Sequence, residues 1–252
     1  MPKKSLGQHW LTDRNTLLDI ANIASGTSDT VLEIGPGLGT LTSALFKYFK
    51  RIITVEFDEQ LAANLPASFP GKNLTVVHSD ILGYDASQLP ANYAVAGNIP
   101  YYITSPIIQK FLHADHKPSK ITLLIQKEVA QRLAAGAGDY SILGLSAQIY
   151  AKVSLGPIVK RDMFTPPPKV DSQVVVLEPH KTPLATEQTM SLIKLGFVAP
   201  RKKLATNLAV TLHLAKERIY ALLDNIGVPK NARPADLSIS DWKKLEKLLH
   251  KQ

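Results

Sequence analysis

A glycine-rich turn that follows a short β-branched run is the feature that most constrains the fold. Residues 31–40 read Val-Leu-Glu-Ile-Gly-Pro-Gly-Leu-Gly-Thr, so glycines stand at positions 35, 37 and 39. Such a turn lets the backbone approach a ligand at the carboxyl end of a strand, where open α/β sheets bind ligands. The spacing differs from the G-x-G-x-x-G of dinucleotide sites, because position 40 is Thr. It therefore predicts an α/β fold and argues against NAD or FAD.

Short β-rich runs alternate with helical stretches from Thr30 onward, which is typical of a mostly parallel sheet covered by helices. Seven strands are expected, and the last two have no helix between them, so they should pair antiparallel at one edge. The expected strands are Thr30–Ile34, Arg51–Glu56, Leu74–Val77, Tyr93–Ala96, Ile121–Gln126, Val153–Pro157 and Val170–Leu177. The expected crossover helices are Thr40–Lys50, Glu59–Leu65 and Ser105–Phe111.

The β pattern stops after Leu177, and the rest of the chain has helical character. Charge divides at the same place: residues 1–180 carry 16 Lys and Arg against 15 Asp and Glu, whereas residues 181–252 carry 13 against 6. A positive lobe on a neutral body favours a polyanionic partner, although a merely solvated basic face is the alternative. Two domains are predicted, 1–180 and 181–252, and the second should contain helices at Glu187–Phe197, Lys202–Leu208, Lys216–Leu223 and Ser240–Leu249.

Composition excludes several classes of site. The 252 residues include no cysteine, which rules out a disulfide framework, a Cys-ligated zinc and a thiolate nucleophile, and no metal site is predicted. No apolar run approaches the roughly 20 residues that cross a bilayer, and the N-terminal residues lack the apolar region of a secretion signal. A cytoplasmic protein without a membrane partner is therefore expected.

Two acidic side chains follow predicted strands near the glycine turn. Glu56 ends the second strand, 19 residues after Gly37, where a carboxylate can accept hydrogen bonds from ribose hydroxyls. Asp80, followed by Ile81, ends the third strand and could accept from an adenine amino group while Ile81 covers the ring. Each feature alone is common for structural reasons. Together they indicate a cofactor that contains adenosine.

The most specific motif is Asn98-Ile-Pro-Tyr101, which follows the fourth strand. The N6 amine of adenine is a poor nucleophile, because its lone pair is delocalised into the ring. The Asn98 side-chain oxygen and a backbone carbonyl held by Pro100 could accept both N6 hydrogens and so localise that lone pair. Tyr101 offers a face on which an extruded base can stack. The alternative is an ordinary turn with packing tyrosines.

With these motifs in place, the chain resembles the small-subunit (16S) ribosomal RNA adenine N6,N6-dimethyltransferase family, the KsgA/RsmA type. Two longer motifs carry the resemblance, namely Lys4-Ser-Leu-Gly-Gln-His-Trp-Leu-Thr-Asp13 and Phe164-Thr-Pro-Pro-Pro-Lys-Val-Asp-Ser172. The resemblance implies a Rossmann-like, seven-stranded class I methyltransferase sheet with a small C-terminal all-α domain. It also implies S-adenosyl-L-methionine as the cofactor. The implied reaction is dimethylation of two adjacent adenines in the 3′-terminal hairpin loop of small-subunit rRNA, during ribosome biogenesis.

The resemblance also implies roles for individual residues. Asn98 would line both the cofactor and the target amine, Pro100 would fix the acceptor carbonyl, and Phe164 would close the base pocket opposite Tyr101. The expected partner is small-subunit rRNA or the assembling subunit, and the protein is expected to act as a monomer. The implied cofactor contacts are His9, Leu11, Gly35, Glu56, Asp80, Ile81 and Asn98. The implied RNA contacts are Lys127, Arg132, Arg201, Lys202 and Lys203, together with Asn207.

Three rival functions stay open. A large-subunit rRNA methyltransferase of the macrolide-resistance type shares the glycine and Asn-Ile-Pro-Tyr motifs, but the segments Phe164–Ser172 and Arg201–Lys203 argue against it. A binding factor that has lost catalysis is disfavoured by the intact Asn98 and Tyr101. DNA adenine methylation would normally need a sequence-reading domain, and none is recognised.

Overall fold

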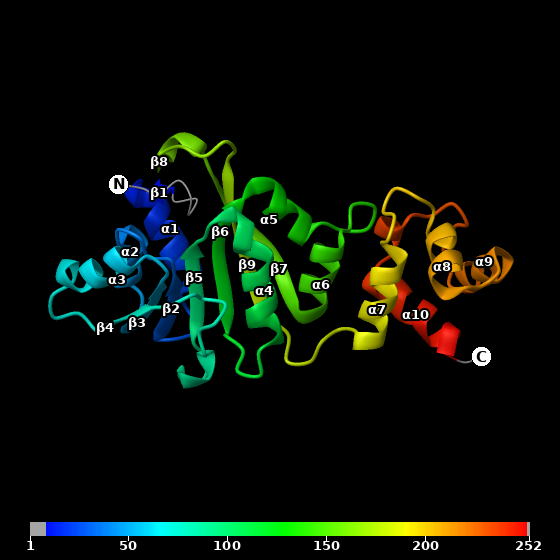
Figure 1. Ribbon diagram of the computed structural model, residues 1–252, viewed down its shortest axis with the longest axis horizontal. Coiled ribbons are helices and arrows are strands. Elements are labelled where there is room, and N and C mark those ends of the chain that lie inside the picture. The colour runs from blue at the N-terminus through cyan, green and yellow to red at the C-terminus, as the bar shows by residue number, and fades with distance from the viewer. Residues whose placement is uncertain (1–8, 251–252) are drawn as a thin grey trace. The chain divides into compact units, whose positions relative to one another are not determined.

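The computed structural model describes residues 9–250, and the chain divides into two compact units (Figure 1). The first unit is formed by the residues up to Gln131 together with Ala151–Pro179. The second is formed by Arg132–Tyr150 together with the chain from His180 onward. One point of division thus lies at the expected boundary, whereas residues 132–150 group with the second unit and not with the first.

A seven-stranded sheet forms the body of the first unit, with strand order β4-β3-β2-β5-β6-β9-β7. All seven expected strands are present, and β9 and β7 form the expected antiparallel pair with β7 at the edge. The five strands from β4 to β6 are parallel. The strands are β2 (Thr30–Ile34), β3 (Arg51–Glu56), β4 (Leu74–His78), β5 (Ala94–Asn98), β6 (Lys120–Gln126), β7 (Ala151–Val159) and β9 (Ser172–Pro179).

The register of the central strands places their carboxyl ends side by side. Ile34, the last residue of β2, pairs with Val55 of β3 on one side and with Gly97 of β5 on the other. Every residue of β2 is buried, as expected for a parallel strand covered on both faces. The segments that leave β2, β3 and β5 therefore start from one edge of the sheet, where ligands bind in open α/β folds.

Helices flank this sheet, and the three expected crossover helices are present with altered bounds. Helix α2 ends at Leu45 and not at Lys50, and the amides of Lys50 and Arg51 donate to the Asp29 carbonyl where the chain enters β3. Helix α1 was not expected, although Asp13 caps it by accepting from the Thr16 amide at 2.8 Å. The helices are α1 (Arg14–Ala24), α2 (Thr40–Leu45), α3 (Glu59–Asn64), α4 (Thr104–His113) and α5 (Lys127–Ala134).

A short antiparallel pair, β1 (Trp10–Leu11) with β8 (Phe164–Thr165), lies outside the main sheet. It joins the first residues that the structure describes to the loop before β9. Leu11 pairs with Phe164, and both side chains are almost fully buried. The two unusual sequence motifs thus meet in space.

The second unit is helical, and the four helices expected in it are present. A fifth helix, α6, was not expected there. It belongs to this unit because the Leu184 amide donates to the Ile149 carbonyl at 2.8 Å and the Tyr150 hydroxyl donates to Glu187. The helices are α6 (Ile142–Tyr150), α7 (Glu187–Gly196), α8 (Leu204–Leu212), α9 (Lys216–Asn225) and α10 (Ile239–His250).

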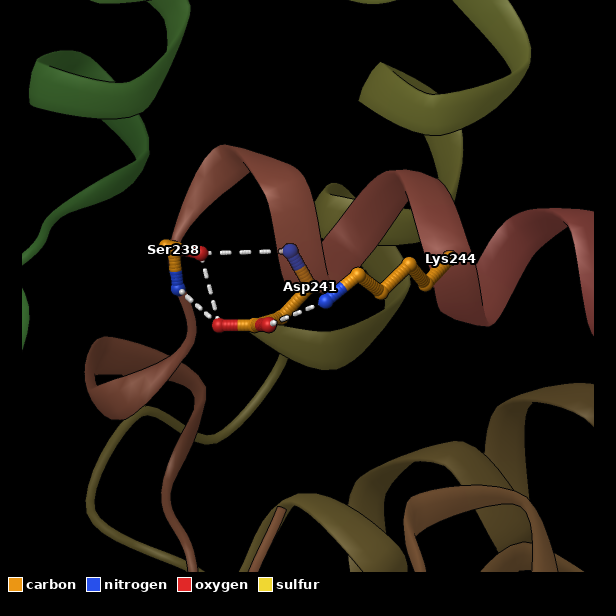
Figure 2. Close-up of polar contacts among 3 residues, drawn as sticks. All are labelled: Ser238, Asp241 and Lys244. Carbon is orange, nitrogen blue, oxygen red and sulfur yellow. Dashed lines mark hydrogen bonds and ion pairs between the residues drawn. The ribbon is translucent and has the colours of Figure 1, made fainter. Parts of the chain in front are cut away.

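Helix α10 begins at Ile239, one residue before the expected Ser240, and Ser238 caps it. The Asp241 amide donates to Ser238 Oγ at 3.2 Å, and the Ser238 amide donates to Asp241 Oδ2 at 3.1 Å (Figure 2). This reciprocal arrangement satisfies backbone donors at the start of the helix. Lys244 Nζ lies 3.9 Å from Asp241 Oδ1.

Among residues 9–250, no helix has the length and apolar character that a bilayer crossing requires.

Candidate active site

A cavity of about 230 Å³ opens at the carboxyl edge of the sheet. Its walls come from the glycine turn after β2, the segments that follow β3, β4 and β5, and the residues around β1. Nine of the predicted site residues lie on these segments and line the cavity. They are His9, Leu11, Gly35, Glu56, Asp80, Ile81, Asn98, Pro100 and Tyr101.

The glycine turn leaves room beside its first glycine. Gly35 has φ 64°, and a Cβ built there would have no atom within 4 Å. Gly39 has φ 80°, and a Cβ there would come within 2.8 Å of both Leu65 and Phe69. Gly39 therefore permits close packing, whereas the open space at Gly35 allows a ligand to lie against the backbone.

Glu56 ties the glycine turn to the end of β3. Its side chain is 6% exposed, Oε2 accepts from the Gly37 amide at 3.0 Å, and Oε1 accepts from the Asp58 amide at 2.9 Å. A carboxylate has about four acceptor positions, so two remain for further donors such as hydroxyl groups in the cavity.

Glu33 is a second buried carboxyl on the same edge, which the sequence did not single out. Its side chain is 1% exposed and lines the cavity, and Oε2 accepts from the Thr42 hydroxyl at 2.6 Å. Burial raises the pKa of Glu33 to about 8, the Thr42 hydroxyl opposes the rise, and the charge of Glu56 adds to it. Glu33 is therefore largely neutral at pH 7.

Asp80 and Ile81 form the next part of the wall. Asp80 Oδ1 accepts from the Leu82 amide at 2.9 Å, which fixes the turn, while Ile81 is 5% exposed. Phe57, which follows Glu56, also lines the cavity, and its ring is 61% exposed. The pairing of an acceptor with apolar surface suits a flat heterocycle that carries an amino group.

Asn98 is oriented by a segment that is distant in sequence. Its Nδ2 donates to the His9 carbonyl at 2.9 Å, and the His9 Nδ1 lies 2.7 Å from the Pro166 carbonyl oxygen. Nδ2 is the donor atom of the side-chain amide and is taken up by this carbonyl, which leaves the acceptor atom, Oδ1. Oδ1 has no hydrogen-bond partner within residues 9–250. An unoccupied acceptor on a side chain that lines the cavity is thereby held in place.

Tyr101 adds an aromatic wall beside Asn98. Its hydroxyl lies 3.0 Å from Ser172 Oγ, and its ring stacks loosely on His9, with centroids 6.3 Å apart and planes inclined by 22°. Burial raises the pKa of the Tyr101 phenol, so it stays protonated near neutral pH. Ser172, at the end of the Phe164–Ser172 motif, was not assigned a role from the sequence and is the residue that anchors this tyrosine.

Phe164 does not occupy the position expected from the sequence. Its side chain is 3% exposed, lies in a hydrophobic cluster with Leu11, Leu17 and Val174, and does not line the cavity. The pairing of β1 with β8 sets Phe164 opposite Leu11 and so accounts for this packing. In this structure Phe164 packs against the β1 segment, apart from the walls of the cavity.

Trp10 lines the cavity, although no role was predicted for it from the sequence. A Cβ at Gly37 would lie 3.3 Å from Trp10 Nε1, so the indole covers the glycine turn. That nitrogen is buried and has no hydrogen-bond partner among the described residues.

Among residues 9–250, no group of His, Asp and Glu side chains could hold a metal ion.

The basic residues expected to face RNA do not line the cavity. Lys127 and Arg132 are on α5, whereas Arg201, Lys202 and Lys203 are exposed and immediately precede α8.

The prediction for Asn207 is wrong. This side chain is 5% exposed, and its Nδ2 donates to the carbonyls of Gly196 at 2.6 Å and Ala199 at 3.0 Å. Asn207 therefore shapes the loop that carries the basic residues and does not face a partner.

Comparison with known proteins adds a family assignment. The family model described as "Ribosomal RNA adenine dimethylase" matches residues 2–251. A curated protein from Dehalococcoides mccartyi (strain CBDB1), named ribosomal RNA small subunit methyltransferase A, is 38% identical over 252 residues, which cover 96% of this chain and 87% of the relative.

Two solved structures share the architecture across nearly the whole chain. A dimethyladenosine transferase from Plasmodium falciparum is 27% identical with a TM-score of 0.81, and the match covers 96% of this chain and 98% of that one. The 23S rRNA methyltransferase ErmE is 30% identical with a TM-score of 0.79, and the match covers 96% of this chain and 99% of that one. The fold is therefore that of these class I methyltransferases.

Proposed function

This chain belongs to the ribosomal RNA adenine dimethylase family, and from that premise we propose that it transfers methyl groups to N6 of adenines in small-subunit rRNA. The proposed target is the pair of adjacent adenines in the 3′-terminal hairpin loop, methylated during ribosome biogenesis. One observation carries the proposal: the Asn98 acceptor, oriented by His9, shares its cavity with Glu56, Asp80 and the open backbone at Gly35.

The cavity fits S-adenosylmethionine as the cofactor. Glu56 would hold the ribose hydroxyls with its remaining lone pairs, and Asp80 with Ile81 would hold the adenine. Gly35, where a side chain would otherwise fill the space, would lie against the ligand. His9 and Leu11 would close the site from the β1 segment. When bound, the cofactor supplies an activated methyl group on a sulfonium.

Asn98 would act on the target amine directly. Its free Oδ1 would accept one N6 hydrogen, and the carbonyl held by Pro100 would accept the other. Both acceptors draw the lone pair out of conjugation with the ring and onto nitrogen, so no strong base is needed. Because the His9 carbonyl already holds the amide nitrogen, little reorganisation is required when the amine arrives.

Tyr101 would bind the face of the extruded adenine. Its hydroxyl is anchored to Ser172, which fixes the plane of the ring at the cavity wall. Stacking of a base on an aromatic side chain contributes about 1–3 kcal/mol. The cost of unstacking an adenine from RNA is of a similar size, and the platform would offset it.

The second unit would supply affinity for rRNA by binding phosphates. Arg201, Lys202 and Lys203 are exposed and have no anionic partner among the described residues. On α5, Lys127 of the first unit and Arg132 of the second unit would bind further phosphates. We propose that the protein acts in the cytoplasm as a monomer, on rRNA or on the assembling small subunit.

The large-subunit rRNA alternative is supported by the likeness to ErmE, with its 30% identity. The curated small-subunit relative, at 38% identity over nearly the whole chain, favours the proposed target instead.

Primer extension along both rRNAs tests the proposal. In a strain without this gene, two adjacent stops near the 3′ end of small-subunit rRNA should disappear, and the gene on a plasmid should restore them. The Asn98→Ala variant should fail to restore them. Stops that change only in large-subunit rRNA would replace the proposed substrate with the alternative one.

A further inference from the structure

Tyr102 is the most exposed of the Phe, Tyr and Trp residues among residues 9–250. Its side chain is 66% exposed, and its hydroxyl has no hydrogen-bond partner within that range. The residue nevertheless lines the active-site cavity. Because the Tyr102 ring lines the cavity and is also largely exposed to water, it lies at the mouth of the cavity.

The two consecutive tyrosines have different surroundings. Tyr101 is half-buried, anchored by Ser172 and stacked on His9, so it belongs to the interior of the cavity. Tyr102 follows it in a single 3-10 turn that spans Tyr101–Ile103 and leads into α4. The backbone turn that positions the Tyr101 ring therefore also fixes where the Tyr102 side chain starts.

The proposed substrate is a polymer, which determines what meets the mouth. A target base inside the cavity stays covalently attached to its neighbours, and successive nucleotides are only about 3.4 Å apart along a stacked strand. When the target base leaves the stack, the next base loses a stacking partner. An aromatic ring at the mouth can replace that partner whatever the identity of the base, since every base has a π face.

We propose that Tyr102 is a platform for the nucleotide adjacent to the target adenine. This inference rests on the proposed function and deepens it, because it assigns a substrate contact outside the catalytic pocket. For a substrate with two neighbouring adenines, the ring holds one adenine while the other occupies the cavity. Tyr102 then determines substrate affinity and does not act in the transfer itself.

Steady-state kinetics with small ribosomal subunits that lack dimethyladenosine test the platform. Tyr102→Ala should raise the KM for subunits by roughly 5- to 150-fold, the range that corresponds to removal of one base stack, and should leave kcat nearly unchanged. Tyr102→Phe and Tyr102→Trp should stay close to wild type, because they keep the ring. Tyr48→Ala, which removes another exposed tyrosine that does not line the cavity, is the matched control.

Calorimetry with S-adenosylhomocysteine separates the substrate from the cofactor. Affinity should be the same for wild type and for Tyr102→Ala. A loss of cofactor affinity as large as the rise in the KM for subunits would show that the ring belongs to the cofactor site. An unchanged KM for subunits would show that no nucleotide stacks on the ring. Either result overturns the platform. A wild-type protein that fails to methylate the subunits would instead overturn the proposed function, from which the platform follows.

Discussion

The two units differ in where they place their charges. The first unit buries three carboxyl side chains, Glu33, Glu56 and Asp58, all within two residues of a strand end. The buried polar residues described in the second unit are all neutral, namely Ser146, Thr189 and Asn207. By sequence the first unit holds 15 Lys and Arg against 14 Asp and Glu, and the second holds 14 against 7.

This contrast follows from secondary structure. The carboxyl edge of a parallel sheet gathers the ends of several strands, so a few acids there can converge on one ligand without being neighbours in sequence. Packed helices satisfy their own backbones and expose long charged side chains on the outer face. The first unit is thereby suited to chemistry in a cavity, and the second to contact with a polyanion.

The largest expected effect separates the chemistry from the proposed RNA-binding surface. Asn98→Ala should lower kcat by about 100- to 1000-fold, because it removes one acceptor aimed at the reacting amine. RNA affinity, measured by filter binding, should change little. Asn64→Ala, at the exposed end of α3, is the control and should retain full turnover. Near-normal turnover of Asn98→Ala would mean that the cavity does not hold the amine where we place it.

The next effect concerns the second unit alone. Replacing Arg201, Lys202 and Lys203 with Glu should reduce the slope of log affinity against log salt, because fewer phosphates are neutralised when the RNA binds. The expected reduction is about 0.7–0.9 for each phosphate that these residues neutralise in the wild type. Cofactor affinity should stay constant, since none of the three residues lines the cavity.

A matched triple variant tests whether location or net charge matters. Lys47, Lys50 and Lys72 are exposed residues of the first unit, and changing all three to Glu alters the net charge equally. Their replacement should leave the salt slope close to wild type. Equal slopes for the two triple variants would show that overall charge, and not the basic loop, attracts the RNA.

A different kind of effect concerns the stability of the first unit. Burial holds the pKa of Glu33 at about 8 in the folded unit, above its ordinary 4.5. The folded state thus binds this proton more tightly than the unfolded chain does. The contribution of this protonation to the free energy of unfolding is complete below about pH 4.5 and is lost as the pH rises through 8. The free energy of unfolding falls by at most about 1.4 kcal/mol per pH unit.

Glu33→Gln should flatten this dependence, because the amide cannot ionise and still accepts from Thr42. Denaturant unfolding between pH 5 and pH 8 measures the effect, with exposed Glu59→Gln as the control. A pH dependence identical to that of wild type would show that Glu33 ionises at its ordinary pKa.

The smallest effects are expected in the α10 cap shown in Figure 2. Ser238→Ala should lower the free energy of unfolding of the second unit by about 1 kcal/mol, since it removes an N-cap acceptor. Lys244→Ala should cost less than about 0.5 kcal/mol, because its ion pair is long and solvent-exposed. Thermal unfolding followed by circular dichroism compares the two. A larger loss for Lys244→Ala would reverse this order.

The parallel sheet could be predicted because its residues carry local signals. The strands Thr30–Ile34 and Arg51–Glu56 have the expected bounds, since β-branched runs end at glycine or at polar residues. Helix α1 was missed although its buried positions Leu17, Ile20, Ala21 and Ala24 have helical spacing after the Asp13 cap. A nearly continuous apolar run such as Ile142–Tyr150 has no clear period, so α6 was missed for a different reason.

The residues that line the cavity could be predicted as a set, whereas the orientations of their side chains could not. Gly35, Glu56, Asp80 and Asn98 share a cavity because each lies at or just after the end of a strand at the same edge. Phe164 and Asn207 stand in equally distinctive segments, yet both side chains are buried. A motif shows that a residue type is required at a position but does not show which way its side chain points.

The amino-acid sequence by itself determined the seven strands of the main sheet and their order along the chain, the charge division and the acids at the carboxyl edge, because local patterns encode each of them. Only the tertiary structure decided how Asn98 is held and that Ser172 anchors the Tyr101 hydroxyl. Asn98 and His9 are 89 residues apart, and His9 and Pro166 are 157 apart. Hydrogen bonds over such separations depend on how β1, β5 and the loop after β8 approach one another, and no local pattern specifies that approach.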